Sequence, residues 1–235
     1  MEFDYRYLIG WYLVFLISVI LHEAAHAWAA KRGGDLTAYA GGQVSLNPWP
    51  HIKRQPWGMV VFPILSTLVF HWPFGFASTP YDPVWAHNHP RKSAWMAAAG
   101  PAANAILVIV AVILIKVGIA SGIFAEPFSV NYQHIVDPVG SGGIEGLTAF
   151  LSMLFTLNLI MVVLNLIPLP PLDGSSIIAL FLNDATARRY KTVISNPVFS
   201  LVGLLLAWQV FSPLFTWVFP GVMNLLYPGA GYHSM

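Results

Sequence analysis

The sequence predicts an all-α polytopic membrane protein with about five to six transmembrane or re-entrant helices. Of its residues, 57% are hydrophobic and 9% are charged, whereas an ordinary soluble domain carries about 25% charged residues. The mean hydropathy is +0.65. A bilayer span takes roughly 20 residues. Five apolar stretches reach or approach this length, at about 8–30, 57–77, 94–119, 147–169 and 197–227. We expect one membrane-embedded domain over 1–235, with a core at 7–183 and C-terminal helices at 197–227.

The first stretch, at 8–30, is expected to stay in the protein as a transmembrane helix. It is too long for the apolar region of a signal peptide, and the residues before it lack the basic start of one.

Cysteine is absent, which excludes disulfides, thiolate metal ligands and cysteine nucleophiles. The net charge of +1 gives no indication of nucleic acid as a partner. The expected surroundings are a lipid bilayer, with the plasma membrane as the expected location.

The basic residues predict how the chain is oriented in the membrane. The loop at 120–146 contains three acidic residues but neither lysine nor arginine. Basic residues lie instead in the other connections, at 31–32, 53–54, 91–92 and 188–191. Because basic loops stay on the cytoplasmic side, the loop at 120–146 is predicted to lie outside and the basic connections inside. The first stretch then runs from outside to inside.

The second stretch, at 57–77, has basic residues on both flanks, so both of its ends belong on the same side of the membrane. It also contains Pro63 and Pro73, which disfavour one unbroken helix. We therefore expect a re-entrant hairpin or two half-helices. A plain membrane span is the alternative.

Two further segments are predicted to depart from simple helices. Residues 33–50 are rich in glycine and proline, with strand-like pieces at 36–39 and 43–46. This pattern favours a small β-hairpin or ribbon after the first helix, and an ordinary membrane-surface loop is the alternative. Two prolines in the last stretch predict one span at about 197–212 followed by a second, short helix.

The segment from Ile20 to Ala27 carries the main functional signal, because it reads I-L-H-E-A-A-H-A within an apolar stretch. On a helix, His22 and His26 share one face and can bind one metal ion. Glu23, next to the first histidine, could activate a metal-bound water. Two imidazoles and a carboxylate are costly to bury in a membrane, and a metal ion is the simplest compensation.

A third metal ligand is expected at Asp173, since a catalytic zinc usually has three protein ligands. This aspartate stands near the end of the run N-L-I-P-L-P-P-L-D-G, from Asn165 to Gly174. The prolines stiffen the turn, and the glycine allows a close backbone approach. The alternative is that Asp173 caps the N-terminus of a helix at about 174–183.

Together these motifs resemble those of the site-2 protease family of intramembrane zinc metalloproteases. H-E-A-A-H lies in a membrane helix, G-P-A-A-N runs from Gly100 to Asn104, and N-L-I-P-L-P-P-L-D-G lies far downstream. The three motifs occur in the order of that family and span about 22–174, which is most of the chain.

The resemblance implies an enzyme that hydrolyses peptide bonds within or near the transmembrane helices of its substrates, such as single-span membrane proteins. It implies one zinc ion per chain, held by His22, His26 and Asp173. Glu23 is implied as the general base, and Asn165 as a residue that holds the substrate chain near the metal. Mechanistically, the amide of Asn104 or Asn165 is a candidate to support the oxyanion, and a purely structural hydrogen bond is the alternative for each. The active site is expected toward the cytoplasmic side.

The sequence departs from the family in places. After L-N-P-W-P-H-I an acidic residue often follows in relatives, but here Lys53 follows. No PDZ or CBS domain is expected, and a regulatory membrane partner or self-association stays open. A metal-ion or proton-coupled transporter that uses the same histidines and glutamate is the rival function. A catalytically idle scaffold ranks last, because all the expected catalytic positions are present.

Overall fold

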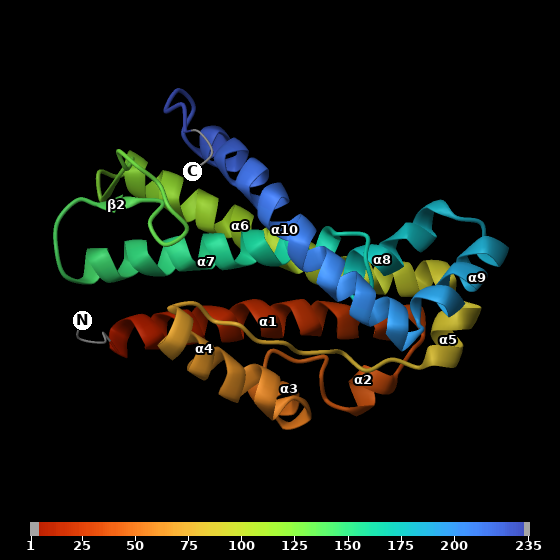
Figure 1. The fold of residues 1–235 in the computed structure, drawn as a ribbon. Coiled ribbons are helices and arrows are strands. Elements are labelled where there is room, and N and C mark those ends of the chain that lie inside the picture. Colours follow the sequence, from red (N-terminus) through yellow and green to blue (C-terminus); the bar gives the residue numbers. More distant parts are fainter. Residues whose placement is uncertain (1–4, 233–235) are drawn as a thin grey trace.

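The computed structural model describes residues 5–232 and consists mainly of α-helices (Figure 1). Four of the described helices are long and apolar enough to cross a membrane. They are α1 (Tyr5–Gly33), α6 (Pro90–Ala120), α7 (Gly143–Leu166) and α10 (Pro197–Leu226). A shorter apolar segment, Trp57–Phe70, adds a further helical element. The prediction of an all-α polytopic membrane protein is therefore confirmed.

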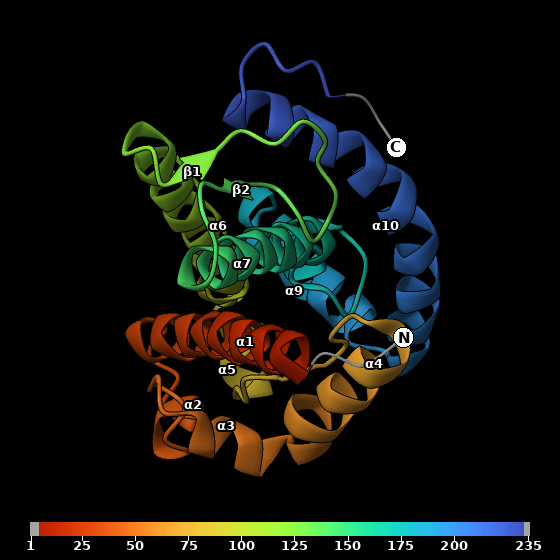
Figure 2. The same cartoon turned by 90° about the vertical axis from the view of Figure 1, so that its left-hand side faces the viewer.

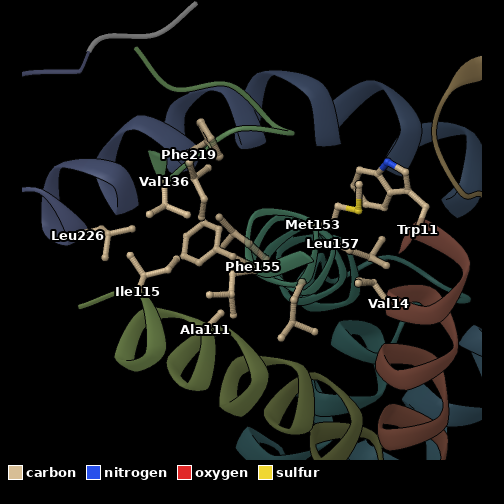
Figure 3. Close-up of a cluster of buried hydrophobic side chains, with 14 of the residues drawn as sticks. Trp11, Val14, Ala111, Ile115, Val136, Met153, Phe155, Leu157, Phe219 and Leu226 are labelled. Carbon is tan, nitrogen blue, oxygen red and sulfur yellow. The ribbon is translucent and has the colours of Figure 1, made fainter. Parts of the chain in front are cut away.

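Three of the long helices, α1, α6 and α7, pack against one another and form the centre of the molecule (Figure 1; Figure 2). Buried apolar side chains fill the space between them, among them Trp11, Ile115 and Phe155, and residues of α10 join this cluster (Figure 3). Lipid tails are as apolar as these side chains. Close van der Waals packing, rather than exclusion of water, therefore holds such helices together.

Helix α10 lies outside this three-helix centre and runs as one continuous helix (Figure 2). The predicted break after residue 212 is therefore wrong, although Pro213 and Pro220 lie inside the helix. In an apolar medium no water can bond to freed backbone groups, so continuing the helix satisfies more of them than a loop would. At Gly203 a Cβ atom would overlap the carbonyl group of Pro170, so α10 passes close to the proline-rich turn.

Residues 57–82 turn back on themselves, which is the chain reversal that a re-entrant hairpin requires. A π-helical turn (Trp57–Val61) leads into α4 (Phe62–Phe70). The chain then returns in extended form beside α1 and reaches α5 (Pro83–Asn88), as Figure 1 shows. The helical limb is too short to count as a membrane span.

Contacts between the two limbs hold this hairpin together. The amide of Phe76 in the returning limb donates to the carbonyl oxygen of Gly58 in the helical limb, at 3.1 Å. At the turn, the rings of Trp72 and Trp11 pack with their centroids 4.4 Å apart. The turn thus lies beside the N-terminal part of α1, and the returning limb runs toward its C-terminal part.

The β-hairpin predicted after the first helix is absent from the described chain. Residues 36–39 fall instead in and beside the short helix α2 (Thr37–Ala40), and 43–46 form bends without a strand partner. The reason is local: the carboxylate of Asp35 accepts hydrogen bonds from the amide (2.9 Å) and the hydroxyl (2.6 Å) of Thr37. Such side-chain-to-backbone bonds favour turns over strands.

Among the described residues, the paired strands are β1 (Phe124–Ala125) and β2 (Asp137–Pro138), in the loop between α6 and α7. They are antiparallel, with Phe124 opposite Pro138 and Ala125 opposite Asp137. The small sheet is therefore present, but at the other end of the molecule from the predicted position (Figure 1).

The remaining short helices lie toward the C-terminal half of α1 (Figure 1). They are α3 (Pro48–Arg54), α8 (Asp173–Ile177), a 3-10 turn (Ile178–Phe181) and α9 (Asp184–Ile194). Both α8 and α9 pack against α6. The helix predicted at 174–183 thus begins one residue earlier and tightens into the 3-10 turn. This arrangement brings the end of the proline-rich turn to the motif on α1.

Candidate metal centre

Three side chains that can bind a metal ion converge at one point. His22 and His26 come from α1, and Asp173 is the first residue of α8. The Oδ2 atom of Asp173 lies 3.3 Å from Nε2 of each histidine, and the two Nε2 atoms lie 3.0 Å apart. Within residues 5–232, this is the group of histidine and acidic side chains close enough to hold a metal ion. The other histidines take no part in it.

The hydrogen bonds behind the two imidazoles determine which nitrogen faces the centre. Nδ1 of His22 lies 2.5 Å from Oδ1 of Asn104, and Nδ1 of His26 lies 2.7 Å from the backbone carbonyl oxygen of Met96. Both partners are acceptors only, so each Nδ1 carries the hydrogen. Each Nε2 then presents a lone pair toward Asp173, as a metal ligand requires.

This donor set fits a zinc ion. Two imidazoles and one carboxylate are a known ligand set of catalytic zinc sites. A tetrahedral ion with ligand distances of about 2.0–2.1 Å needs donor atoms about 3.3 Å apart, and the separations here are 3.0–3.3 Å. The two nitrogen lone pairs and the carboxylate oxygen repel one another at such distances. A cation bound between them would attract all three and offset this repulsion.

Asp173 stands at the start of α8, and the close approach of that start to α7 sets its position. The N-cap position of α8 belongs to Leu172, and no side chain makes a capping hydrogen bond there. The capping alternative for Asp173 is therefore not realised, and its carboxylate faces the histidines. At Gly174 a Cβ atom would overlap the carbonyl oxygens of Leu166 and Ile167. Glycine thus lets α8 start directly against the end of α7.

Gly100 explains part of the G-P-A-A-N motif. A Cβ atom at Gly100 would overlap the imidazole nitrogens of His22 and His26. Only glycine therefore lets α6 lie close enough for the two rings to stand between α1 and α6 in their present positions.

Asn104 lies behind His22 and is fully buried. Its Oδ1 holds the ring of His22, while its amide group donates to Oδ1 of Asn158 at 2.7 Å. The amide of Asn158 donates in turn to the hydroxyl of Ser18 at 2.9 Å. These three residues, from α6, α7 and α1, connect the central helices by polar contacts. Asn158 and Ser18 were missed by the sequence analysis, although polar residues inside apolar helices are a signal for such contacts.

Glu23 is 6% exposed and lies outside the group of three side chains that could hold a metal ion. The hydroxyl of Thr79 donates to its Oε2 at 2.7 Å and lies 2.9 Å from its backbone carbonyl oxygen. Thr79 belongs to the returning limb of the 57–82 hairpin, so this segment fixes the position of the glutamate. No motif in the sequence marked Thr79, because the contact joins residues far apart in the chain.

A cavity of about 270 Å³ opens beside these residues. His22, Glu23, His26 and Asp173 line it, together with Asn165 at the end of α7. Asn165 is half-buried, and Asn104 is absent from the cavity wall. The two asparagines singled out in the sequence therefore occupy different places, Asn165 at the cavity and Asn104 behind His22.

The chain also resembles known proteins. The profile described as Peptidase family M50 matches residues 11–209. YwhC of Bacillus subtilis (strain 168) is 32% identical over 168 residues, and Rip2 of Mycolicibacterium smegmatis (strain ATCC 700084 / mc(2)155) is 29% identical over 182 residues. Their names describe both as candidate zinc metalloproteases.

These two alignments cover 71% and 76% of this chain and 66% and 58% of the relatives. The chain thus spans less than two thirds of the length of either relative. No solved structure matches the chain.

Proposed function

Because this chain belongs to peptidase family M50, we propose that it is a zinc metalloendopeptidase that cleaves membrane proteins in or near their transmembrane segments. The observation that carries the proposal is the convergence of His22, His26 and Asp173 beside Glu23, in a cavity among membrane-type helices. Three ligands and a neighbouring carboxylate are the parts that metal-assisted hydrolysis needs.

Each residue has a role in this reaction. A zinc ion bound by the three ligands would polarise the scissile carbonyl group and lower the pKa of a bound water to about 7. Glu23 takes a proton from the attacking water and passes it to the leaving amine. Thr79 holds one carboxylate oxygen of Glu23, so the other oxygen stays available for the proton. Asn165, on the cavity wall, is the candidate to bind the substrate chain.

Asn104 is assigned a positioning role rather than the oxyanion role. Its oxygen keeps the hydrogen of His22 on Nδ1, so Nε2 stays free to bind the metal. Its amide hydrogens are used by Asn158 and the backbone of Ser18, so none is left for a substrate oxygen. Between the two asparagines, we therefore place the oxyanion contact at Asn165.

The protein is an integral membrane protein, and we place it in the plasma membrane with the site toward the cytoplasm. The argument is the positive-inside rule applied to the basic connections. The metal ligands on α1 lie in its C-terminal half, close to Lys31 and Arg32. Water needed for hydrolysis would then reach the cavity from the cytoplasmic side.

Single-span membrane proteins are the proposed substrates. A regulatory membrane partner, or self-association, is compatible with the exposed surface of α10.

The proposal is tested by cleavage of a single-span test substrate by the purified, zinc-loaded protein in lipid. We expect cleavage that stops on addition of a chelator and returns with added zinc. In cells that carry Glu23→Gln, single-span proteins should accumulate in the membrane fraction, and proteomics would identify them. The rival transporter predicts the opposite pattern, namely no cleavage by the wild type and transmembrane flux of an ion that depends on the same histidines.

A further inference from the structure

Lys191 is a buried cation in the wall of the cavity that holds the metal ligands. It lies on α9 and is 9% exposed. Its Nζ atom donates to the hydroxyl of Ser93, in the first turn of α6, which also lines the cavity. Among the described residues, no carboxylate forms an ion pair with it. The reaction proposed above makes no use of this lysine.

An ammonium group without a counter-ion is costly to bury. Burial accordingly lowers the pKa of Lys191 to about 8, so most of the molecules carry the positive charge at neutral pH. The ammonium group has three hydrogens to donate. Ser93 accepts one of them, and the other two remain for a bound group. The cavity wall thus offers a charge and donors that the protein itself leaves without an anion.

The shared cavity makes a peptide the natural partner of this charge. Lys191 and Ser93 line the same space as His22, Glu23 and Asp173. A peptide whose scissile bond lies at the metal ligands would therefore pass Lys191 within the cavity. Carboxylates are the anions that a peptide supplies, either as acidic side chains or as a free C-terminus. Hydrogen bonds between charged groups are also stronger than those between neutral groups.

We propose that Lys191 and Ser93 form a carboxylate-binding subsite, which selects peptides that carry an anionic group close to the cleaved bond. This inference rests on the proposed proteolytic function and adds a substrate preference to it. The subsite binds the carboxylate through the ammonium group of Lys191, and the Ser93 hydroxyl keeps that group in place.

The experiment compares apolar test peptides that differ in one group. Glutamate or glutamine is placed at each position flanking the cleaved bond, and each peptide is made with a free or an amidated C-terminus. The value of kcat/KM is measured for the wild type, and Kd is measured for the zinc-loaded Glu23→Gln protein, in which turnover is suppressed. We expect a preference of about tenfold or more for the carboxylate. The glutamate arm and the terminal arm identify which carboxylate the subsite binds.

Lys191→Met should reduce the carboxylate-to-neutral ratio to about one, whatever its effect on absolute rates. Lys92→Met is the matched control. It removes a positive charge one residue from Ser93, but Lys92 lines a different groove and bonds to the carbonyl oxygen of Gly33. The control should keep the wild-type ratio. If Lys191→Met fails to fold, the wild-type peptide series decides alone.

The outcomes separate this inference from the proposed function. Cleavage without any carboxylate preference would overturn the subsite and leave the protease assignment intact. A carboxylate preference in Kd without cleavage of any peptide would support the subsite and overturn the protease assignment. A ratio that stays at the wild-type value in Lys191→Met would also overturn the subsite.

Discussion

The side-chain oxygen of Asn104 lies 2.5 Å from Nδ1 of His22, on the far side of the imidazole from Asp173. This contact joins the G-P-A-A-N motif of α6 to the H-E-A-A-H motif of α1. It directs the Nε2 lone pair of His22 toward Asp173, and it commits the side-chain oxygen of Asn104 to a contact within the protein. The two motifs thus meet in one site, in which the asparagine fixes the orientation of a histidine proposed to bind zinc.

Asn104→Ala is therefore expected to weaken zinc binding by about 10–100-fold, the usual effect of losing a partner behind a metal-bound histidine. Zinc affinity measured by competition with a chelator tests this. Asn165→Ala is the comparison: Asn165 lines the cavity beside the candidate ligands, so zinc affinity should be retained while kcat falls, as expected when an oxyanion donor is lost. Unchanged zinc affinity in Asn104→Ala, together with a large fall in kcat, would instead support the oxyanion role.

Gly100→Ala is expected to abolish or strongly reduce zinc binding, because the added methyl group would overlap both imidazoles. Gly146→Ala is the control, since a Cβ atom there meets no other atom within 4 Å and alanine is the better helix former. Zinc content and thermal stability of both variants should be measured after purification. Full zinc content in Gly100→Ala would show that α6 does not approach the histidines as closely as described.

Thr79→Val is expected to lower the cleavage rate by about 10–100-fold with zinc retained, because Glu23 loses the hydroxyl that fixes its position. Valine keeps the shape of the side chain, so loss of packing is not the cause. Thr79→Ser retains the hydroxyl and should keep most of the activity. A wild-type rate in Thr79→Val would mean that the returning limb of the 57–82 hairpin does not position the general base.

Reporters fused near residues 85 and 185 are expected on the cytoplasmic side, and one fused near 130 outside. The structure supports a common side for the first two positions, because α5 packs against α9 and Arg91 pairs with Asp184 at 3.4 Å. Accessibility labelling in intact cells measures all three. A reporter at 85 on the same side as one at 130 would contradict the orientation.

Several parts of the site could be predicted because their signals are local. The spacing of His22 and His26 places both on one helix face whatever the rest of the chain does. The proline-rich run before Asp173 likewise indicated a stiff turn that presents a carboxylate, and the structure places that carboxylate 3.3 Å from both histidines. The basic flanks of 57–77 indicated a hairpin, and the chain does reverse there.

Other parts depend on contacts that the sequence does not display. The Asn158–Ser18 bond joins residues 140 positions apart, and the Thr79–Glu23 bond joins residues 56 apart. Two predictions were wrong because a local hydrogen bond, or the apolar surroundings of a helix, outweighed the structural preference of the residue types. The Asp35 carboxylate accepts a hydrogen bond from the amide of Thr37, and this bond favours a helical turn although the residue types that follow favour a strand. Helix α10 stays helical through Pro213 because its surroundings are apolar.

The most direct test of the zinc-hydrolase assignment is to measure bound zinc and peptide cleavage in the same samples of Glu23→Gln and Asp173→Asn. Glu23→Gln should keep one zinc ion per chain while cleavage falls by about 10²–10⁴-fold, since only the general base is lost. Asp173→Asn should lose zinc, because a full negative charge is removed from the ligand set in a site of low dielectric. Cleavage at the wild-type rate by Glu23→Gln, or zinc held as tightly by Asp173→Asn as by the wild type, would contradict the assignment.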